Sequence, residues 1–224
     1  QPPTPANWID QLADKIEIQR LCNMGVLMPE AEYGAKVESR LTTRFVYDWR
    51  LKDYSGPNNN EPTRKRWLRR SRCVAREYAF LEHREDTFAP ASSTHVLNIL
   101  PVLWLQKAAD FEASKGTDSG CEWLLATLDV KDAFLMVPQP EVLKIRVGSE
   151  NYIVLRNLPG QRQGARSWYW HLRKWLDDSF NVEWCLEQPC LCRGNNFCLL
   201  THVDDILYCG SRQFWNDVFL PTFK

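Results

Sequence analysis

Apolar and polar positions alternate along the chain in a way that predicts short strands and a few amphipathic helices. In residues 7–24, Trp8, Leu12 and Ile16 recur at helical spacing. This predicts a helix on which these three side chains share one face and which Asn7 can cap. Period-two patterns and apolar runs indicate strands elsewhere, each bounded by turn residues.

The predicted strands are short, and most are joined by short connections. Such a mixture favours an α+β fold with an antiparallel sheet covered by helices on one face. The other predicted helices cover 90–111, 164–180 and about 213 to the C-terminus, and the predicted strands cover 45–49, 70–76, 123–129, 144–147, 152–155, 197–201 and 206–209.

A basic segment spans residues 64–76 and has seven cationic side chains. Arg70, Arg72 and Arg76 occupy alternate positions of a predicted strand, so they share one face of it. A row of this kind is typical of a solvated edge strand. It is equally typical of a phosphate-binding surface, because guanidinium groups bind phosphate in a bidentate way. The pattern by itself leaves both interpretations open.

Two groups of carboxylates stand inside apolar, strand-like runs. Asp204 and Asp205 interrupt residues 199–208, and Asp129 interrupts residues 126–134. Charge in such surroundings costs desolvation energy unless a cation compensates it. If the two strands are neighbours, Asp129 and Asp204 can reach one pair of Mg²⁺ ions, as in two-metal phosphoryl transfer. The alternative for each aspartate alone is a turn or cap residue.

Composition excludes few classes of protein. The 224 residues are 44% hydrophobic, enough for a core, and 28 basic residues balance 28 acidic ones. This balance argues against a protein that is basic all over, but not against a local nucleic-acid surface. No run approaches the ~20 apolar residues of a membrane span. The first residues lack the form of a signal peptide, so we expect an intracellular protein.

Eight cysteines occur in the chain. Without a signal sequence, reduced thiols are the better expectation than disulfides. Cys190, Cys192, Cys198 and His202 suggest a zinc site as an alternative, although their spacing matches no common zinc motif. Small buried thiols are the simpler interpretation.

Several motifs follow one another in a characteristic order. Because of this order and spacing, the sequence resembles the reverse transcriptase of copia-type long-terminal-repeat retrotransposons over roughly residues 40 to 220. The matching stretches are residues 72–76, 85–90, 128–135, 158–168 and 203–205.

The resemblance implies a right-hand polymerase fold with fingers and a palm, the antiparallel palm sheet being backed by helices. It implies an N-terminal helical lead-in over 1–40, fingers over 41–121 and a palm over 122–224. A fingers excursion is expected around 138–163. The chain is expected to stop before the thumb.

The resemblance also implies roles for single residues in the catalytic centre. Asp129 and Asp204 would be ligands of two Mg²⁺ ions, with Mn²⁺ as a substitute, and Asp205 would be the third carboxylate. Phe134 would lie under the sugar and reject a 2′-hydroxyl by steric contact.

Further implied contacts concern the incoming nucleotide. Gln163 and Gly164 would line it. Arg72, together with Arg70, would contact its triphosphate.

The implied activity is RNA-directed DNA polymerisation. Its partners would be an RNA or DNA primer-template, deoxynucleoside triphosphates and the rest of the polyprotein, including ribonuclease H and integrase, with no membrane partner. The implied location is a cytoplasmic virus-like particle with later access to the nucleus. The alternative is a decayed, catalytically inactive fragment that keeps the fold or binds nucleic acid. A zinc-binding module would be a third class.

Overall fold

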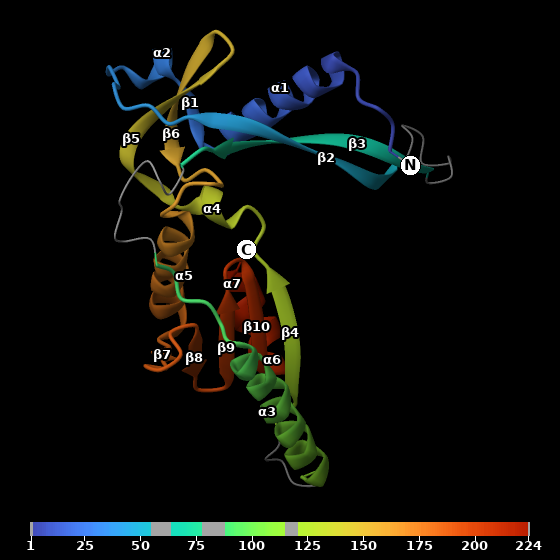
Figure 1. Ribbon diagram of the computed structural model, residues 1–224. Coiled ribbons are helices and arrows are strands. Elements are labelled where there is room, and N and C mark those ends of the chain that lie inside the picture. Colours follow the sequence, from blue (N-terminus) through green and yellow to red (C-terminus); the bar gives the residue numbers. More distant parts are fainter. Residues whose placement is uncertain (1, 55–63, 78–87, 115–120, 224) are drawn as a thin grey trace. The chain divides into compact units, whose positions relative to one another are not determined.

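The computed structural model describes residues 2–54, 64–77, 88–114 and 121–223 (Figure 1). It is a mixture of helices and antiparallel strands, as the sequence predicts. The chain forms two compact units, Gln1–Glu85 with Phe134–Gly164, and Asp86–Ala133 with Ala165–Lys224. The assignment of fingers and palm to particular residue ranges stays a prediction. The predicted loop at 54–62 lies almost wholly outside the described residues.

The first unit combines a long hairpin, a three-stranded sheet and helix α1. Strands β2 and β3 form the hairpin, and the sheet has the order β1-β6-β5. Apolar side chains from α1, β3 and the sheet form one buried core, which includes Leu21, Cys73 and Ile145. The elements are α1 (Asn7–Asn23), β1 (Leu27–Pro29), α2 (Glu30–Tyr33), β2 (Thr43–Tyr54), β3 (Arg64–Ala75), β5 (Pro138–Val147) and β6 (Glu150–Arg156), with α4 (Ala133–Met136) beginning at the unit boundary.

Helix α1 has the predicted extent, and the face that Trp8, Leu12 and Ile16 share is exposed. Trp8, Leu12 and Ile16 are 64%, 50% and 61% exposed. The helix lies along β3 instead through its acidic side, where Asp10 pairs with Arg69 at 2.7 Å. Ala13, Ile18 and Leu21 are the apolar residues that α1 buries, and Ile18 and Leu21 join the core that includes Cys73 of β3, so the buried face combines this second apolar row with the charge pair. Asn7 is the first helical residue, and the cap position before it makes no side-chain hydrogen bond.

The second unit is built on a five-stranded antiparallel sheet of order β4-β10-β9-β8-β7. Its strands are β4 (Trp123–Asp129), β7 (Glu183–Trp184), β8 (Leu191–Gly194), β9 (Phe197–His202) and β10 (Asp205–Ser211). Its helices are α3 (Thr94–Ala113), α5 (Gly164–Phe180), α6 (Arg212–Phe214), the π-helix η1 (Trp215–Phe219) and α7 (Leu220–Thr222).

Both faces of this sheet are covered, whereas the sequence analysis expected helices on one face. On one face, Cys209 belongs to a core cluster with Val96 and Leu100 of α3. On the other face, the ring of Tyr208 lies 5.3 Å from that of Phe219 in η1. Consecutive residues of β10 point to opposite faces, and both are apolar. A strand of this kind needs cover on both sides.

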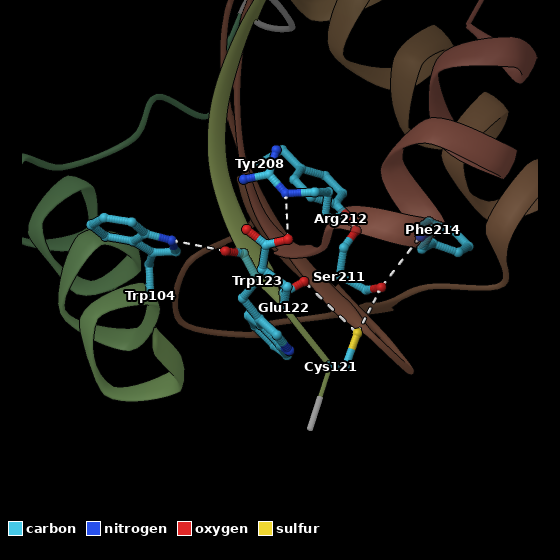
Figure 2. Close-up of polar contacts among 8 residues, drawn as sticks. All are labelled: Trp104, Cys121, Glu122, Trp123, Tyr208, Ser211, Arg212 and Phe214. Atoms are coloured by element: carbon cyan, nitrogen blue, oxygen red, sulfur yellow. Dashed lines mark hydrogen bonds and ion pairs between the residues drawn. The ribbon is translucent and has the colours of Figure 1, made fainter. Parts of the chain in front are cut away.

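Polar contacts hold β4 and β10 in register at the end of the sheet where β4 begins (Figure 2). Ser211 is the register partner of Trp123. Beside them, Arg212 and Glu122 form an ion pair at 2.9 Å, and the thiol of Cys121 donates to the Ser211 hydroxyl at 3.0 Å. A slip of one residue would turn every β10 side chain to the opposite face. This group therefore fixes which residues oppose each other at the far end of the two strands.

Candidate active site

The hairpin β9–β10 reverses through a two-residue turn, Val203–Asp204, flanked by the pair His202 and Asp205. Val203 has a φ of 55°. Two-residue hairpin turns require such left-handed angles and normally place Gly, Asn or Asp there. A β-branched residue in this conformation costs about 1–3 kcal/mol and is held only by its surroundings.

Two hydrogen bonds hold this strained turn. The indole Nε1 of Trp168, a residue that is 3% exposed on α5, donates to the carbonyl of Val203 at 2.5 Å. The backbone N–H of Val130, just after β4, donates to the carbonyl of Asp204 at 2.9 Å. The turn is therefore pinned by a helix and by the neighbouring strand.

A further contact lies beside the turn. The hydroxyl of Ser92 and Nδ1 of His202 are 2.9 Å apart. This contact ties the segment before α3 to the end of β9.

The register of β4 and β10 brings together carboxylates from distant parts of the sequence. Asp205 is the direct partner of Asp129, and both are exposed. Direct partners in an antiparallel pair have Cα atoms about 4.5–5.5 Å apart and side chains on the same face. Like charges in this position repel each other, which favours a cation beside them. Asp204 follows in the turn and is half-buried.

The adjacency of the two strands confirms the condition on which the metal-site prediction depended. The residue opposite Asp129, however, is Asp205 and not Asp204. Within the described ranges, no three His, Cys, Asp or Glu side chains form a group that could hold a metal ion. Two opposed carboxylates nevertheless fit the usual coordination of Mg²⁺, which binds one or two carboxylates and completes its coordination shell with water and substrate phosphates.

The predicted nucleotide contacts lie in the first unit. The ring of Phe134 packs against Gly164: a Cβ added at Gly164 would lie 3.2 Å from Phe134 Cδ1. Gly164 therefore leaves room for the ring. Gln163 comes immediately before Gly164 and is half-buried.

The turn that precedes Gln163 is fixed on the end of β3. The N–H of Ala75 donates to the carbonyl of Pro159 at 2.7 Å. Gly160 has a φ of 91°, and a Cβ there would lie 2.4 Å from the Ala75 oxygen. Only glycine allows this approach. Gln161, which is 6% exposed, accepts from the N–H of Leu158 at 2.7 Å and closes the turn.

Arg70 and Arg72 lie on one face of the β2–β3 hairpin, opposite Asp48 and Val46. Arg72 is exposed, and Arg70 is half-buried. Burial lowers the pKa of Arg70, and the nearby charges of Arg72 and Arg50 lower it further. The same face also has Arg50, Lys52 and Arg66 by register. The alternation expected from the sequence is thus present, and the surface is strongly cationic.

The structure thus groups the predicted site residues into two sets. The carboxylates Asp129, Asp204 and Asp205 belong to the second unit. The predicted nucleotide contacts belong to the first unit: Arg70, Arg72, Phe134, Gln163 and Gly164. The catalytic roles of all eight stay predictions.

All eight cysteines are free thiols, as expected. Cys190 and Cys192 are buried, and desolvation raises the pKa of Cys192 to about 12. These thiols are therefore protonated at neutral pH and behave as small apolar side chains.

Sequence reasoning missed the supporting residues of the carboxylate turn. Trp168 is a buried residue of α5, and its hydrogen bond to Val203 depends on a contact between segments far apart in sequence. The contact between Ser92 and His202 likewise joins distant segments. No local pattern indicates either contact.

Neither the known protein families nor the curated proteins contain a match to this chain. Among solved structures, the chain is similar to a foamy viral protease-reverse transcriptase that was determined in complex with double-stranded DNA, at 13% identity and a TM-score of 0.46. The similarity covers 100% of this chain and 30% of that chain. No helix in the described residues is long and apolar enough to span a membrane.

Proposed function

We propose that this chain is the fingers and palm part of an RNA-directed DNA polymerase of the copia type. It would extend a primer 3′-hydroxyl on an RNA or DNA template by nucleotidyl transfer. The observation that carries the proposal is the direct pairing of Asp129 with Asp205 across β4 and β10, next to Asp204 in a strained turn.

The carboxylates would hold divalent ions. Asp129 and Asp205 are exposed at the end of the sheet and so open to a substrate, and a bound cation would relieve their mutual repulsion. Magnesium bound there would supply positive charge at the attacking and leaving oxygens of phosphoryl transfer. The turn pinned by Trp168 would keep Asp204 in place, as pre-organised sites require.

The first unit would bind the nucleotide. Phe134, seated against Gly164, would exclude a 2′-hydroxyl by steric contact. Gln163 would be presented by the turn that is locked on Ala75. The cationic face of β2–β3, with Arg70 and Arg72, would bind phosphate groups and make the interaction sensitive to salt.

Primer extension on a homopolymer template tests the proposal. The chain should incorporate deoxynucleotides in the presence of Mg²⁺. Asp204→Asn should lower the rate of incorporation by at least about 10²-fold, as is usual when a group that stabilises transition-state charge is lost. Asp217→Asn is the matched control because Asp217 is an exposed aspartate of the same unit, outside the carboxylate group.

A second assay distinguishes a chain that lacks catalytic activity from one that binds the primer-template duplex too weakly to be tested in the first assay. The assay is repeated at low salt, where phosphate contacts to the primer-template duplex are strongest. Extension that depends on Asp204 in either assay supports the proposal. Failure in both assays, with a folded protein, contradicts it and favours a fragment without catalysis.

A further inference from the structure

A cavity of about 1020 Å³ lies wholly within the first unit, and none of the residues assigned to nucleotide binding lines it. It is formed by α1, β1, α2, β2, and β5 and β6 with the turn between them. Its volume is at the upper end of the range for ligand-binding cavities, about 300–1,000 Å³. Its apolar lining consists mainly of Ile18, Leu27, Met28, Phe45, Val147 and Leu155.

The charged groups of the cavity are predominantly acidic. Asp14, Glu32 and Glu150 line it, with Lys15 as the opposing charge. Asp14 accepts hydrogen bonds from the neutral hydroxyls of Tyr47, at 3.0 Å, and of Ser71, at 2.5 Å. Neutral donors leave the charge of a carboxylate intact.

Titratable groups around the cavity respond to this negative charge. The hydrogen bond to Glu150, together with burial, raises the pKa of Tyr152 to about 12. Burial raises the pKa of the Cys22 thiol, and the charges of Glu32 and Glu150 raise it further. The cavity thus disfavours added negative charge and favours cations, which is the opposite of a phosphate-binding site.

We propose that this cavity binds a short peptide segment of another protein in which basic side chains flank an apolar one. The apolar lining would take the central side chain, and the carboxylates of Glu32 and Glu150 would pair with the flanking guanidinium or ammonium groups. Both requirements are met by one amphipathic, cationic ligand. This inference does not depend on the proposed polymerase activity.

A bulky apolar side chain is what distinguishes this ligand from a simple polyamine. Burial of such a side chain is favourable by roughly 25 cal/mol per Å² of apolar surface, whereas the carboxylates alone would attract any organic cation. The test therefore compares the fluorescein-labelled tripeptide amide Arg-Leu-Arg with its neutral counterpart Gln-Leu-Gln, with Arg-Gly-Arg and with spermidine.

Two measurements on the full chain detect binding. Fluorescence anisotropy gives the affinity for the tripeptide. Alkylation by iodoacetamide, followed by mass spectrometry, reports on Cys22, which lines the cavity. Arg-Leu-Arg should slow alkylation of Cys22 and leave Cys121 unaffected, because Cys121 is an exposed cysteine of the second unit.

The variant Glu32→Gln/Glu150→Gln should bind Arg-Leu-Arg about 5-fold more weakly, as expected for the loss of two exposed charge pairs. Glu141→Gln is the matched control, because Glu141 is an exposed glutamate of the same unit that does not line the cavity. Circular dichroism checks that each variant folds.

Protection of Cys22 by Arg-Leu-Arg, together with weaker protection by Gln-Leu-Gln and Arg-Gly-Arg, supports the proposal. Equal protection by spermidine overturns the assignment to a peptide. Unchanged alkylation of Cys22 at saturating tripeptide, or equal affinity in the double variant and the Glu141 control, overturns the site itself.

Discussion

At the scale of single residues, the cross-strand pair of Asp129 and Asp205 is an unfavourable arrangement in the absence of a cation. Like charges directly opposite each other on neighbouring strands destabilise the pair. The arrangement is therefore informative, because the strands could accommodate many neutral residues at these exposed positions.

Asp205→Asn should accordingly stabilise the metal-free protein. We expect the free energy of unfolding in EDTA to rise by about 0.2–1 kcal/mol, the usual range for such cross-strand pairs. Urea denaturation measures it, and excess Mg²⁺ should remove the advantage by stabilising the wild type. A decrease in stability in EDTA would show that Asp205 makes a favourable interaction instead.

The left-handed backbone at Val203 leads to a second prediction. Val203→Gly should raise the free energy of unfolding by about 1 kcal/mol, because glycine adopts a positive φ without steric cost. Val46→Gly is the control at an equally exposed valine in a strand, and it should lower stability. If both variants lose stability in the same way, the strain at Val203 is not real.

At the scale of elements, contacts at one end of the β4–β10 pair support the register that places Asp129 opposite Asp205 at the other end. Ser211 is buried and is the N-cap of α6, where its hydroxyl accepts a hydrogen bond from the N–H of Phe214 at 3.3 Å. The same hydroxyl accepts a hydrogen bond from the thiol of Cys121, which lies just before the start of β4 (Figure 2). This residue links the strand pair to the helix that follows it.

Ser211→Ala should lower the free energy of unfolding by about 1 kcal/mol, the usual cost of losing a cap. Ser93→Ala is the matched control, since Ser93 occupies the cap position of α3 but makes no side-chain hydrogen bond there. It should change stability by a few tenths of a kcal/mol at most. Thermal and urea unfolding of the two variants decide between these expectations, and equal effects would exclude a special role for Ser211.

Elements with a strong apolar period were predictable from the sequence. The observed bounds of α5, Gly164–Phe180, and β4, Trp123–Asp129, agree with the sequence analysis. The buried face of α1 was not predictable, because it depends on a basic strand some 55 residues or more away in sequence. Periodicity reports which residues share a face, but the partner decides which face is buried.

At the scale of the whole molecule, the sequence predicted an α+β fold with antiparallel strands, and the catalytic chemistry stays a prediction. The metal-site hypothesis required the strands around Asp129 and Asp204 to be neighbours, and β4 and β10 are neighbours. The opposition of Asp129 and Asp205, and the hydrogen bond from Trp168 to the turn, arise from long-range pairing. No local pattern specifies such pairing, so these features required the folded chain.

Binding of Mn²⁺ to the full chain, followed by electron paramagnetic resonance, is the direct test of a metal site at Asp129 and Asp205. Such a site predicts saturable Mn²⁺ binding that Mg²⁺ displaces. Asp129→Asn and Asp205→Asn should each weaken it by about tenfold or more, since each removes one of two opposed charges, while Asp217→Asn should leave it unchanged. Equal Mn²⁺ affinity in all four proteins would contradict a metal site at these carboxylates.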